Sequence, residues 1–584
     1  MTQMHRVEYT ALSEAQVERA LAAAAKPSGV SPLSRALSGR SLSIATDDGP
    51  SFEYRFADDE LTLSVDGGRR IAAGYGALTL NHITLISHLI PGTLRGYVVI
   101  IDEDTKLVTV FEHWFGGEIW VSGAGQEQQT LRVPREVQRE VYFGYLADAN
   151  QSAPQARMAR TNRAEGRGYH WRQDNGAETL EFFPSKSYSN FVELTRFGTQ
   201  MSFCAPSDYI QIDEKTYIYQ RTECEFSGTM TIYVFDSNRV EQIGVRLGFD
   251  EQDRLEYYLF RGTGEWLGQM AQYEAFGDTA GPVVTGPNGE ALPKGARRVF
   301  RPKRTFDAMT NSEVAALAAA RTRPFEPTHL THNSQKTSAY LIGKPFSLRW
   351  DNGLLVEYRI DAIDRLAWRA NGGAWQTETY RAWESAPDLI MFAHFLTGAP
   401  DQDCHVMVAD FASGLATLLH GTMGTAYVGN EASVTTVFGV IEAEGVQSPT
   451  HLRHRLTDEI VGRALTWNYQ PGLTSMHLYS TPTSVSWIIM GDDGSGGMEW
   501  SGAASYVKIR EDIFLCYWLE EASGSPLGTF LVNMKTMHNC GVTYSCKRDE
   551  GLRLSPLGAH SRHTGQFDTR RFFDVSSDGG RFEA

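Results

Sequence analysis

Apolar and polar residues alternate with a period of two along most of the chain. The alternation recurs in segments rich in aromatic and β-branched residues, such as 51–56, 97–101, 209–212 and 255–260, and it is typical of strands with one buried face. Asn-Gly, Asp-Gly and Gly-Gly turns separate these segments, which favours hairpins over crossover helices. Because the strands of such meanders must protect their edges, we predict small antiparallel barrels of about seven to nine strands.

The chain also repeats itself. Residues 167–171 parallel 463–467, and 217–223 parallel 514–520, so the two halves keep the same order. A finer repeat relates 343–353 to 462–472. Repeats of this kind are the signature of duplicated units, and each unit has the size expected of a single core.

We therefore predict a fold of the all-β class that is mainly, though not entirely, β. It consists of four barrels arranged as two pairs. A short Ala-rich helix precedes each pair, and Ser13 with Gln16 fits a capping box at the start of the first. The predicted units are an N-terminal helical segment at 1–30, barrels at 31–155 and 156–295, a linker and helix at 296–335, and barrels at 336–448 and 449–584.

Composition excludes several classes of function. With 42% hydrophobic and 21% charged residues in 584, the chain has ordinary globular values. Its net charge of −16 opposes nucleic-acid binding. No apolar stretch is long enough for a membrane span, and the start lacks a signal-peptide layout, so we expect the cytoplasm. The six cysteines lack a disulfide-framework spacing. The oligomeric state is left open, a homo-oligomer included.

Several segments near the C-terminus resemble a known family. Residues 457–469, 477–480, 517–520 and 556–563 are similar to the C-terminal domain of the molybdenum-cofactor biosynthesis protein F (MoaF) family. The resemblance implies lipocalin-like (calycin) barrels and, through the repeats, two family-like units in tandem. It implies no particular activity.

A looser resemblance concerns chemistry. Residues 198–200 and 217–223 are similar in layout to bacterial phenolic acid decarboxylases, which are lipocalin-like lyases. The resemblance places Glu223 on the family's glutamate, but Gln200 stands where the family has an arginine. Arg196 and Arg221 are the candidates for a replacement clamp on a substrate carboxylate.

Aligning one strand in all four units gives a candidate site. We predict that His88, Glu223, His394 and Glu520 occupy one barrel position, each among apolar or aromatic neighbours. Burial would move the pKa of such a group, which is how a general acid or base is tuned towards neutrality. The alternative is that these four are hydrogen-bonded core residues.

Two functions follow as hypotheses. The first is a cofactor-independent lyase that decarboxylates, dehydrates, hydrates or cleaves a small aromatic or conjugated substrate by acid and base catalysis. The second is a non-catalytic barrel that binds a small apolar molecule, as an accessory of a cofactor or natural-product pathway. Glu223 or Glu520 would carry the proton. The expected orienting, wall-forming and substrate-contacting residues are Tyr217, Tyr219, Arg221, Trp171, Trp467, Trp518, Tyr169, Tyr469, His477, His88 and His394.

Other catalytic signatures are missing from the sequence. It contains no Gly-x-Ser-x-Gly elbow and no phosphate-binding Gly-x-x-x-x-Gly-Lys-Ser/Thr loop. The His-x-x-His pairs at 451–454 and 560–563 lack the Cys or carboxylate partners of a zinc site. We therefore expect no metal and no nucleotide or redox cofactor, and a small aromatic or apolar molecule as the partner.

Overall fold

The structure is a computed structural model of the chain. Gln200 and Cys224 lie outside the residues that it describes. The described residues are 12–116, 118–121, 129–148, 152–186, 188–196, 201–223, 227–272, 297–299, 309–425, 428–491, 499–520 and 526–573.

Two α-helices occur in the described part of the chain, α1 (Glu14–Ala23) and α2 (Asn311–Ala320), together with a short 3-10 helix, η4 (Arg570–Phe572). The predicted capping box is present, because the Ser13 amide donates to Oε1 of Gln16 at 2.9 Å. Each helix buries one apolar face, α1 through Val17 and Leu21. The prediction of two Ala-rich helices is confirmed.

Two sets of eight strands each form a closed antiparallel barrel. The strands of barrel 1 are β2 (Ser41–Thr46), β3 (Phe52–Phe56), β4 (Glu60–Val65), β5 (Ile71–Leu80), β6 (Ile83–Leu89), β7 (Arg95–Asp102), β8 (Leu107–Phe115) and β11 (Val137–Leu146). Those of barrel 3 are β23 (Phe346–Trp350), β24 (Leu355–Ile360), β25 (Arg365–Ala370), β26 (Gln376–Ala386), β27 (Leu389–Phe395), β28 (Cys404–Asp410), β29 (Leu415–Met423) and β30 (Ala432–Glu442).

Two further sets of eight strands lie within a 20-stranded sheet. Each returns to its own first strand, because β13 pairs with β20 and β32 pairs with β39. The strands of barrel 2 are β13 (Arg167–Gln173), β14 (Glu178–Phe182), β15 (Tyr188–Glu193), β16 (Ser202–Gln211), β17 (Thr216–Thr222), β18 (Met230–Asp236), β19 (Glu241–Phe249) and β20 (Leu255–Met270). Those of barrel 4 are β32 (Arg463–Gln470), β33 (Leu473–Thr481), β34 (Ser484–Gly491), β35 (Glu499–Arg510), β36 (Ile513–Leu519), β37 (Leu527–Asn533), β38 (His538–Lys547) and β39 (Gly551–Phe567).

Seven short strands complete the part of the fold that the structure describes. Two of them run parallel to the last strand of a barrel: β1 lies on β20 and β22 lies on β39. Three others form a separate small sheet in the order β10-β9-β21. The bounds of the seven are β1 (Ser28–Gly29), β9 (Glu118–Val121), β10 (Gln129–Arg132), β12 (Ala159–Arg160), β21 (Arg297–Val299), β22 (Thr322–Pro324) and β31 (Arg455–Leu456).

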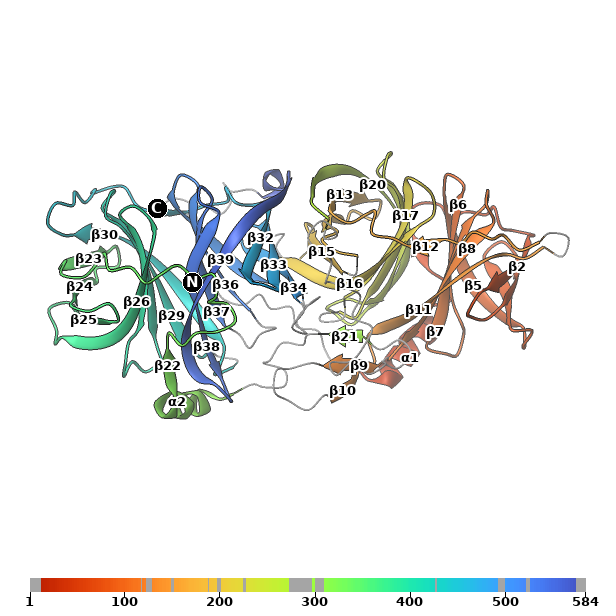
Figure 1. The fold of residues 1–584 in the computed structure, drawn as a ribbon. Coiled ribbons are helices and arrows are strands. Elements are labelled where there is room, and N and C mark those ends of the chain that lie inside the picture. Colours follow the sequence, from red (N-terminus) through yellow and green to blue (C-terminus); the bar gives the residue numbers. More distant parts are fainter. Residues whose placement is uncertain are drawn as a thin grey trace.

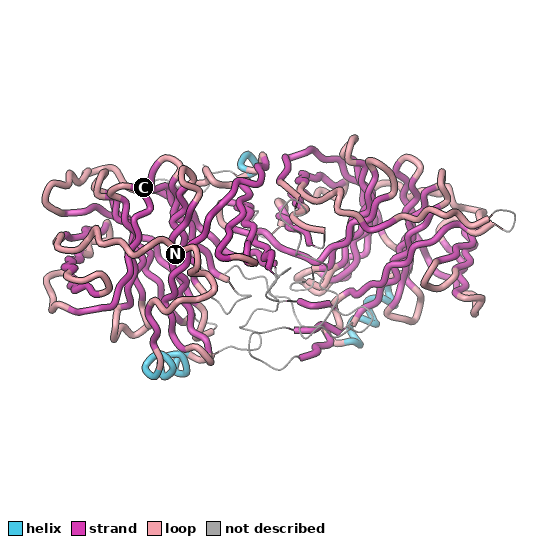
Figure 2. The backbone as a smooth tube through the Cα atoms, in the orientation of Figure 1, coloured by secondary structure: helices cyan, strands magenta, loops and turns pink. Residues whose placement is uncertain are grey.

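The barrels stand in a row in the order 1, 2, 4, 3, as Figure 1 and the backbone trace in Figure 2 show. The end of β20 pairs with the end of β39, which joins barrels 2 and 4 into one sheet. Shared apolar clusters fill the other two junctions: α1 packs with barrels 1 and 2, and α2 packs with barrels 3 and 4. The prediction of a mainly β chain built on antiparallel barrels is confirmed.

One turn recurs in all four barrels and fixes their register. It follows β7, β18, β28 and β37, where a side-chain oxygen accepts hydrogen bonds from the backbone amides two and three residues later, as in an Asx turn. The residue that supplies the oxygen is paired with the first residue of the preceding strand. These pairs are Asp102 with Ile83, Asp236 with Thr216, Asp410 with Leu389, and Asn533 with Ile513.

Among the described residues, no helix combines the length and the apolar character needed to cross a bilayer.

Candidate functional site

The recurring turn corrects the predicted alignment of the four titratable residues. Counting five residues from the first residue of the strand gives His88 and His394 in barrels 1 and 3, but Arg221 and Trp518 in barrels 2 and 4. Glu223 and Glu520 lie two residues further on. The two carboxylates are therefore equivalent to each other and not to the histidines. A slip of two residues keeps the same face inward, so alternation alone could not reveal it.

The histidines of barrels 1 and 3 are core residues. Nε2 of His88 lies 3.1 Å from the Tyr54 hydroxyl, and Nε2 of His394 lies 3.4 Å from the Tyr358 hydroxyl. Burial lowers the pKa of each imidazole to about 4, so both are neutral at pH 7. These contacts match the alternative stated above for the two residues, namely hydrogen-bonded positions in a filled core.

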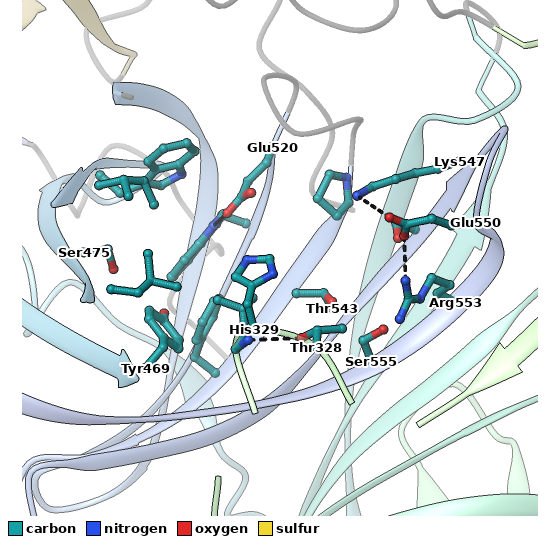
Figure 3. Close-up of a pocket in the computed structure, with 18 of the residues that line it drawn as sticks. Thr328, His329, Tyr469, Ser475, Glu520, Thr543, Lys547, Glu550, Arg553 and Ser555 are labelled. Carbon is teal, nitrogen blue, oxygen red and sulfur yellow. Dashed lines mark hydrogen bonds and ion pairs between the residues drawn. The ribbon is translucent and has the colours of Figure 1, made fainter. Parts of the chain in front are cut away.

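Barrel 4 contains a cavity of about 400 Å³. Four predicted residues line it: Tyr469, His477, Trp518 and Glu520. The segment 327–330, which follows β22, lines it too, and Figure 3 shows His329 of that segment among the lining side chains. Trp467 does not line the cavity and belongs to the apolar core of the barrel.

Glu520 projects from the end of β36 into this cavity. The indole N–H of Trp518 donates to its Oε1 at 2.6 Å, and the Trp518 ring stacks on Phe530 with centroids 4.0 Å apart. An N–H donor to a carboxylate stabilises its ionised form. The carboxylate therefore stands beside a flat aromatic surface, with Oε1 held by the indole N–H.

His477 and Trp487 supply polar atoms to the same cavity. Nε2 of His477 lies 2.8 Å from Oγ of Ser475, and burial lowers the pKa of the imidazole to about 3, so the ring is neutral. Nδ1 of His477 and Nε1 of Trp487 have no hydrogen-bond partner among the described residues, although both side chains are buried. Buried polar atoms normally have partners, so these two are suited to atoms of a ligand.

A charged group borders the cavity on another side. Glu550 lies between two cations, with its carboxylate 3.6 Å from Nζ of Lys547 and 2.8 Å from Nη1 of Arg553 (Figure 3). One carboxylate for two cations leaves a local positive charge. The cavity thus combines an aromatic wall, one internal carboxylate and a positively charged border.

In barrel 2 the predicted catalytic residues are locked in ion pairs. Glu223 accepts from Nη1 of Arg246 at 2.8 Å and lies 3.5 Å from Nε of Arg221. Burial alone would raise the pKa of Glu223, but the two guanidinium groups outweigh it and bring the pKa to about 2. The expectation of a carboxylate tuned towards neutrality is therefore wrong for Glu223. Arg221 is held as well, because its Nη1 donates to Glu181 at 2.6 Å.

The aromatic candidates of barrel 2 fill its interior. Tyr169, Trp171, Tyr217 and Tyr219 belong to one buried cluster of ten residues. The Tyr219 hydroxyl donates to Oγ of Ser189 at 2.6 Å. These side chains pack against one another, and none of the four lines a cavity of about 360 Å³ that lies elsewhere in barrel 2.

Sequence reasoning missed the residues that complete the cavity of barrel 4: Ser475, Trp487, Lys547 and Arg553. Ser475 pairs with Trp467 across the first hairpin, and the equivalent pair in barrel 2 joins Thr179 to Trp171. The repeated tryptophan could therefore have pointed to Ser475. The other three carry no comparable signal. Within the described residues, no group of three or more His, Cys, Asp or Glu side chains is placed to hold a metal ion.

The matches to family models lie in the second half of the chain. No curated protein is significantly similar to the chain. A crystal structure from Burkholderia vietnamiensis, provisionally described as a beta-lactamase, is 18% identical and covers 19% of this chain and 99% of its own, with a TM-score of 0.15. That similarity carries no argument about fold or activity. The MoaF N-terminal domain matches residues 328–425 and the MoaF C-terminal domain matches residues 454–567. Residues 328–567 therefore carry both MoaF domains in order, and this part of the chain belongs to the MoaF family.

Proposed function

We propose that the protein binds a small aromatic or conjugated molecule in the cavity of barrel 4 and acts on it as a cofactor-independent lyase, with Glu520 as the proton-transferring group. One observation carries the proposal: Glu520 lines a cavity of about 400 Å³ beside stacked aromatic rings. Its equivalent in barrel 2, Glu223, is held by two arginines. Barrel 4 is thus favoured over barrel 2.

The lining supports a substrate that is flat and carries oxygen atoms. The stacked Trp518 and Phe530 rings offer a planar apolar wall. The indole N–H of Trp487 has no partner within the described residues and would donate to a carbonyl or phenolic oxygen. Lys547 and Arg553 at the border would attract a carboxylate.

The proposed chemistry needs a base and a dry site. Glu520, which accepts a hydrogen bond from the Trp518 N–H, would take a proton from a substrate hydroxyl or an acidic carbon and return it to the carbon skeleton. His477 is neutral at pH 7, because burial lowers its pKa to about 3. It would therefore orient an oxygen rather than serve as the acid.

The test compares Glu520→Gln with the native protein on a panel of hydroxylated cinnamates and aromatic aldehydes. Turnover is followed by loss of the conjugated absorbance, and binding by quenching of tryptophan fluorescence. We expect Glu520→Gln to lower turnover by about 100-fold or more while ligand affinity changes by less than about threefold. Glu511→Gln, on an exposed side chain, is the matched control. Unchanged turnover in Glu520→Gln would refute the role of Glu520.

A second candidate is a non-catalytic binding protein. The two buried polar atoms without partners, on His477 and Trp487, favour recognition of ligand oxygens whether or not a reaction follows. This candidate predicts ligand quenching by the native protein with no turnover of any panel member. Trp487→Phe would then weaken binding, and Glu520→Gln would not.

We also propose that the first half of the chain is a second copy of the two-domain MoaF unit, so that four lipocalin-like (calycin) barrels form two pairs. Two observations support this. The same turn fixes the register in every barrel, and in each half a short strand pairs in parallel with the last strand of a barrel, β1 with β20 and β22 with β39. The five described cysteines are free thiols, four of them buried, which supports a reducing compartment such as the cytoplasm.

A further inference from the structure

Barrel 2 has a cavity of its own, of about 360 Å³, at the position equivalent to the cavity of barrel 4. Thr179 in barrel 2 and Ser475 in barrel 4 line the two cavities, and each pairs with the equivalent tryptophan. The turn Asn175-Gly176 closes one side. The two cavities are therefore one site of the fold, present twice.

The lining of the two cavities differs in chemistry. Thr179 pairs with Glu193, whereas Ser475 pairs with Ile489, so a carboxylate replaces an aliphatic side chain at this position. Counting from the turn, Arg221 stands where barrel 4 has Trp518. The barrel 2 site is thus built for a polar ligand, in contrast to the aromatic site of barrel 4.

Three arginines and two carboxylates, Glu193 and Glu256, line this cavity, and three further carboxylates behind the lining pair with the same arginines. Arg221 contacts Glu181 and Glu223, Arg246 contacts Glu223 and Glu256, and Arg196 contacts Glu193, Glu251 and Glu256. Each guanidinium is therefore already shared between at least two carboxylates. An anionic ligand would have to displace one of these carboxylates, whereas a cationic ligand would complete the balance of charge.

Glu193 has a buried carboxylate oxygen that accepts no hydrogen bond. Its side chain is 8% exposed. Oε2 has no hydrogen-bond partner, because Nε of Arg196, with which it forms an ion pair, lies 3.6 Å away. Burial raises the pKa of this carboxyl, and the nearby charge of Glu223 raises it further against the arginines. A buried carboxylate oxygen without a donor points to a donor that arrives with a ligand.

We propose that the mouth of barrel 2 is a second binding site, for a small primary amine whose ammonium group donates to Oε2 of Glu193. The rings of Tyr258 and Phe260 line the same cavity and favour an amine that carries an apolar or aromatic body. The site is independent of the chemistry assigned to barrel 4.

The probe is benzylamine, with benzyl alcohol and benzoate as neutral and anionic analogues of the same size, measured by titration calorimetry on the full chain. We expect benzylamine to bind at least about tenfold more tightly than either analogue. Glu193→Gln should weaken benzylamine binding about tenfold or more. Glu178→Gln, on a half-exposed neighbour in β14, is the control and should leave binding unchanged.

A second variant distinguishes loss of amine binding from loss of folding. Glu193→Ile introduces the residue of the equivalent position in barrel 4, and it should also abolish amine binding while benzyl alcohol binding is kept. Tighter binding of benzoate than of benzylamine would overturn the proposal. So would benzylamine binding that survives in both Glu193 variants or is lost in Glu520→Gln, since the latter would place the amine in barrel 4.

Discussion

The ion pairs between Arg246 and its carboxylates in barrel 2 give a quantitative prediction. Arg246 is 7% exposed, and its guanidinium donates to Glu223 at 2.8 Å and to Glu256 at 2.8 Å. Replacing it with Met keeps most of the volume and leaves Glu223 as a buried charge with one cation fewer. Breaking a buried pair in this way costs about 3–5 kcal/mol.

The pKa of Glu223 gives a second route to the same magnitude. The carboxyl is held at about 2, against an ordinary value of 4.5, and this difference corresponds to about 3 kcal/mol of stability at neutral pH. Because the folded pKa is the lower one, this stability is present above pH 4.5 and is lost as the pH falls towards 2. In Arg246→Met that loss should be much smaller.

The assay is a double-mutant cycle read by native-state hydrogen exchange of β17 and β18, which isolates barrel 2 from the other barrels. Arg246→Met, Glu223→Gln and the double variant are compared at pH 7. We expect a coupling free energy of about 3 kcal/mol, with the double variant about as stable as Arg246→Met or more so. Effects that add within about 0.5 kcal/mol would refute the coupling.

Two further predictions follow from single sites. His88 has a pKa lowered to about 4 by burial, so its contribution to stability falls by about 2 kcal/mol between pH 7 and pH 5; His88→Gln should flatten the pH dependence of urea unfolding by that amount, and an unchanged slope would contradict it. Gly343 and Gly462 both have positive φ, but an added Cβ meets nothing within 4 Å at Gly343 and meets the Phe567 carbonyl at Gly462. Gly343→Ala should therefore cost about 1 kcal/mol and Gly462→Ala about 3 kcal/mol or more, measured by thermal unfolding, and equal costs would refute the crowding argument.

Much of the fold could be predicted from the sequence because alternation with a period of two reports directly on which face is buried. The equivalence of Glu223 and Glu520 came from a repeat in the sequence and agrees with the strand register. The placement of His88 and His394 failed, because slipping a strand by two residues leaves the pattern unchanged. Asp102 and its counterparts at the turn would have fixed the register.

The sites were harder to predict than the strands. Whether a side chain lines a cavity or fills a core depends on how side chains of several strands pack together, and Tyr217 and Tyr219 pack into the aromatic core of barrel 2 where contact with a substrate was expected. Glu193 carries no sequence signal, because a Glu in an alternating strand resembles a residue facing solvent. Its burial follows from Arg196, Arg221 and Arg246, which are distant from one another in the sequence but adjacent in the barrel.

The pairing between β20 and β39 can form only late in the synthesis of the protein by the ribosome. Residues 268–270 pair with 565–567, so one edge of β20 lacks a partner at its last residues until almost the entire chain has been translated. During that interval the edge is open to strands of other nascent chains. Slow elongation through the second half would lengthen this exposure. Expression with a ribosome-associated chaperone should therefore raise the soluble yield of the full chain.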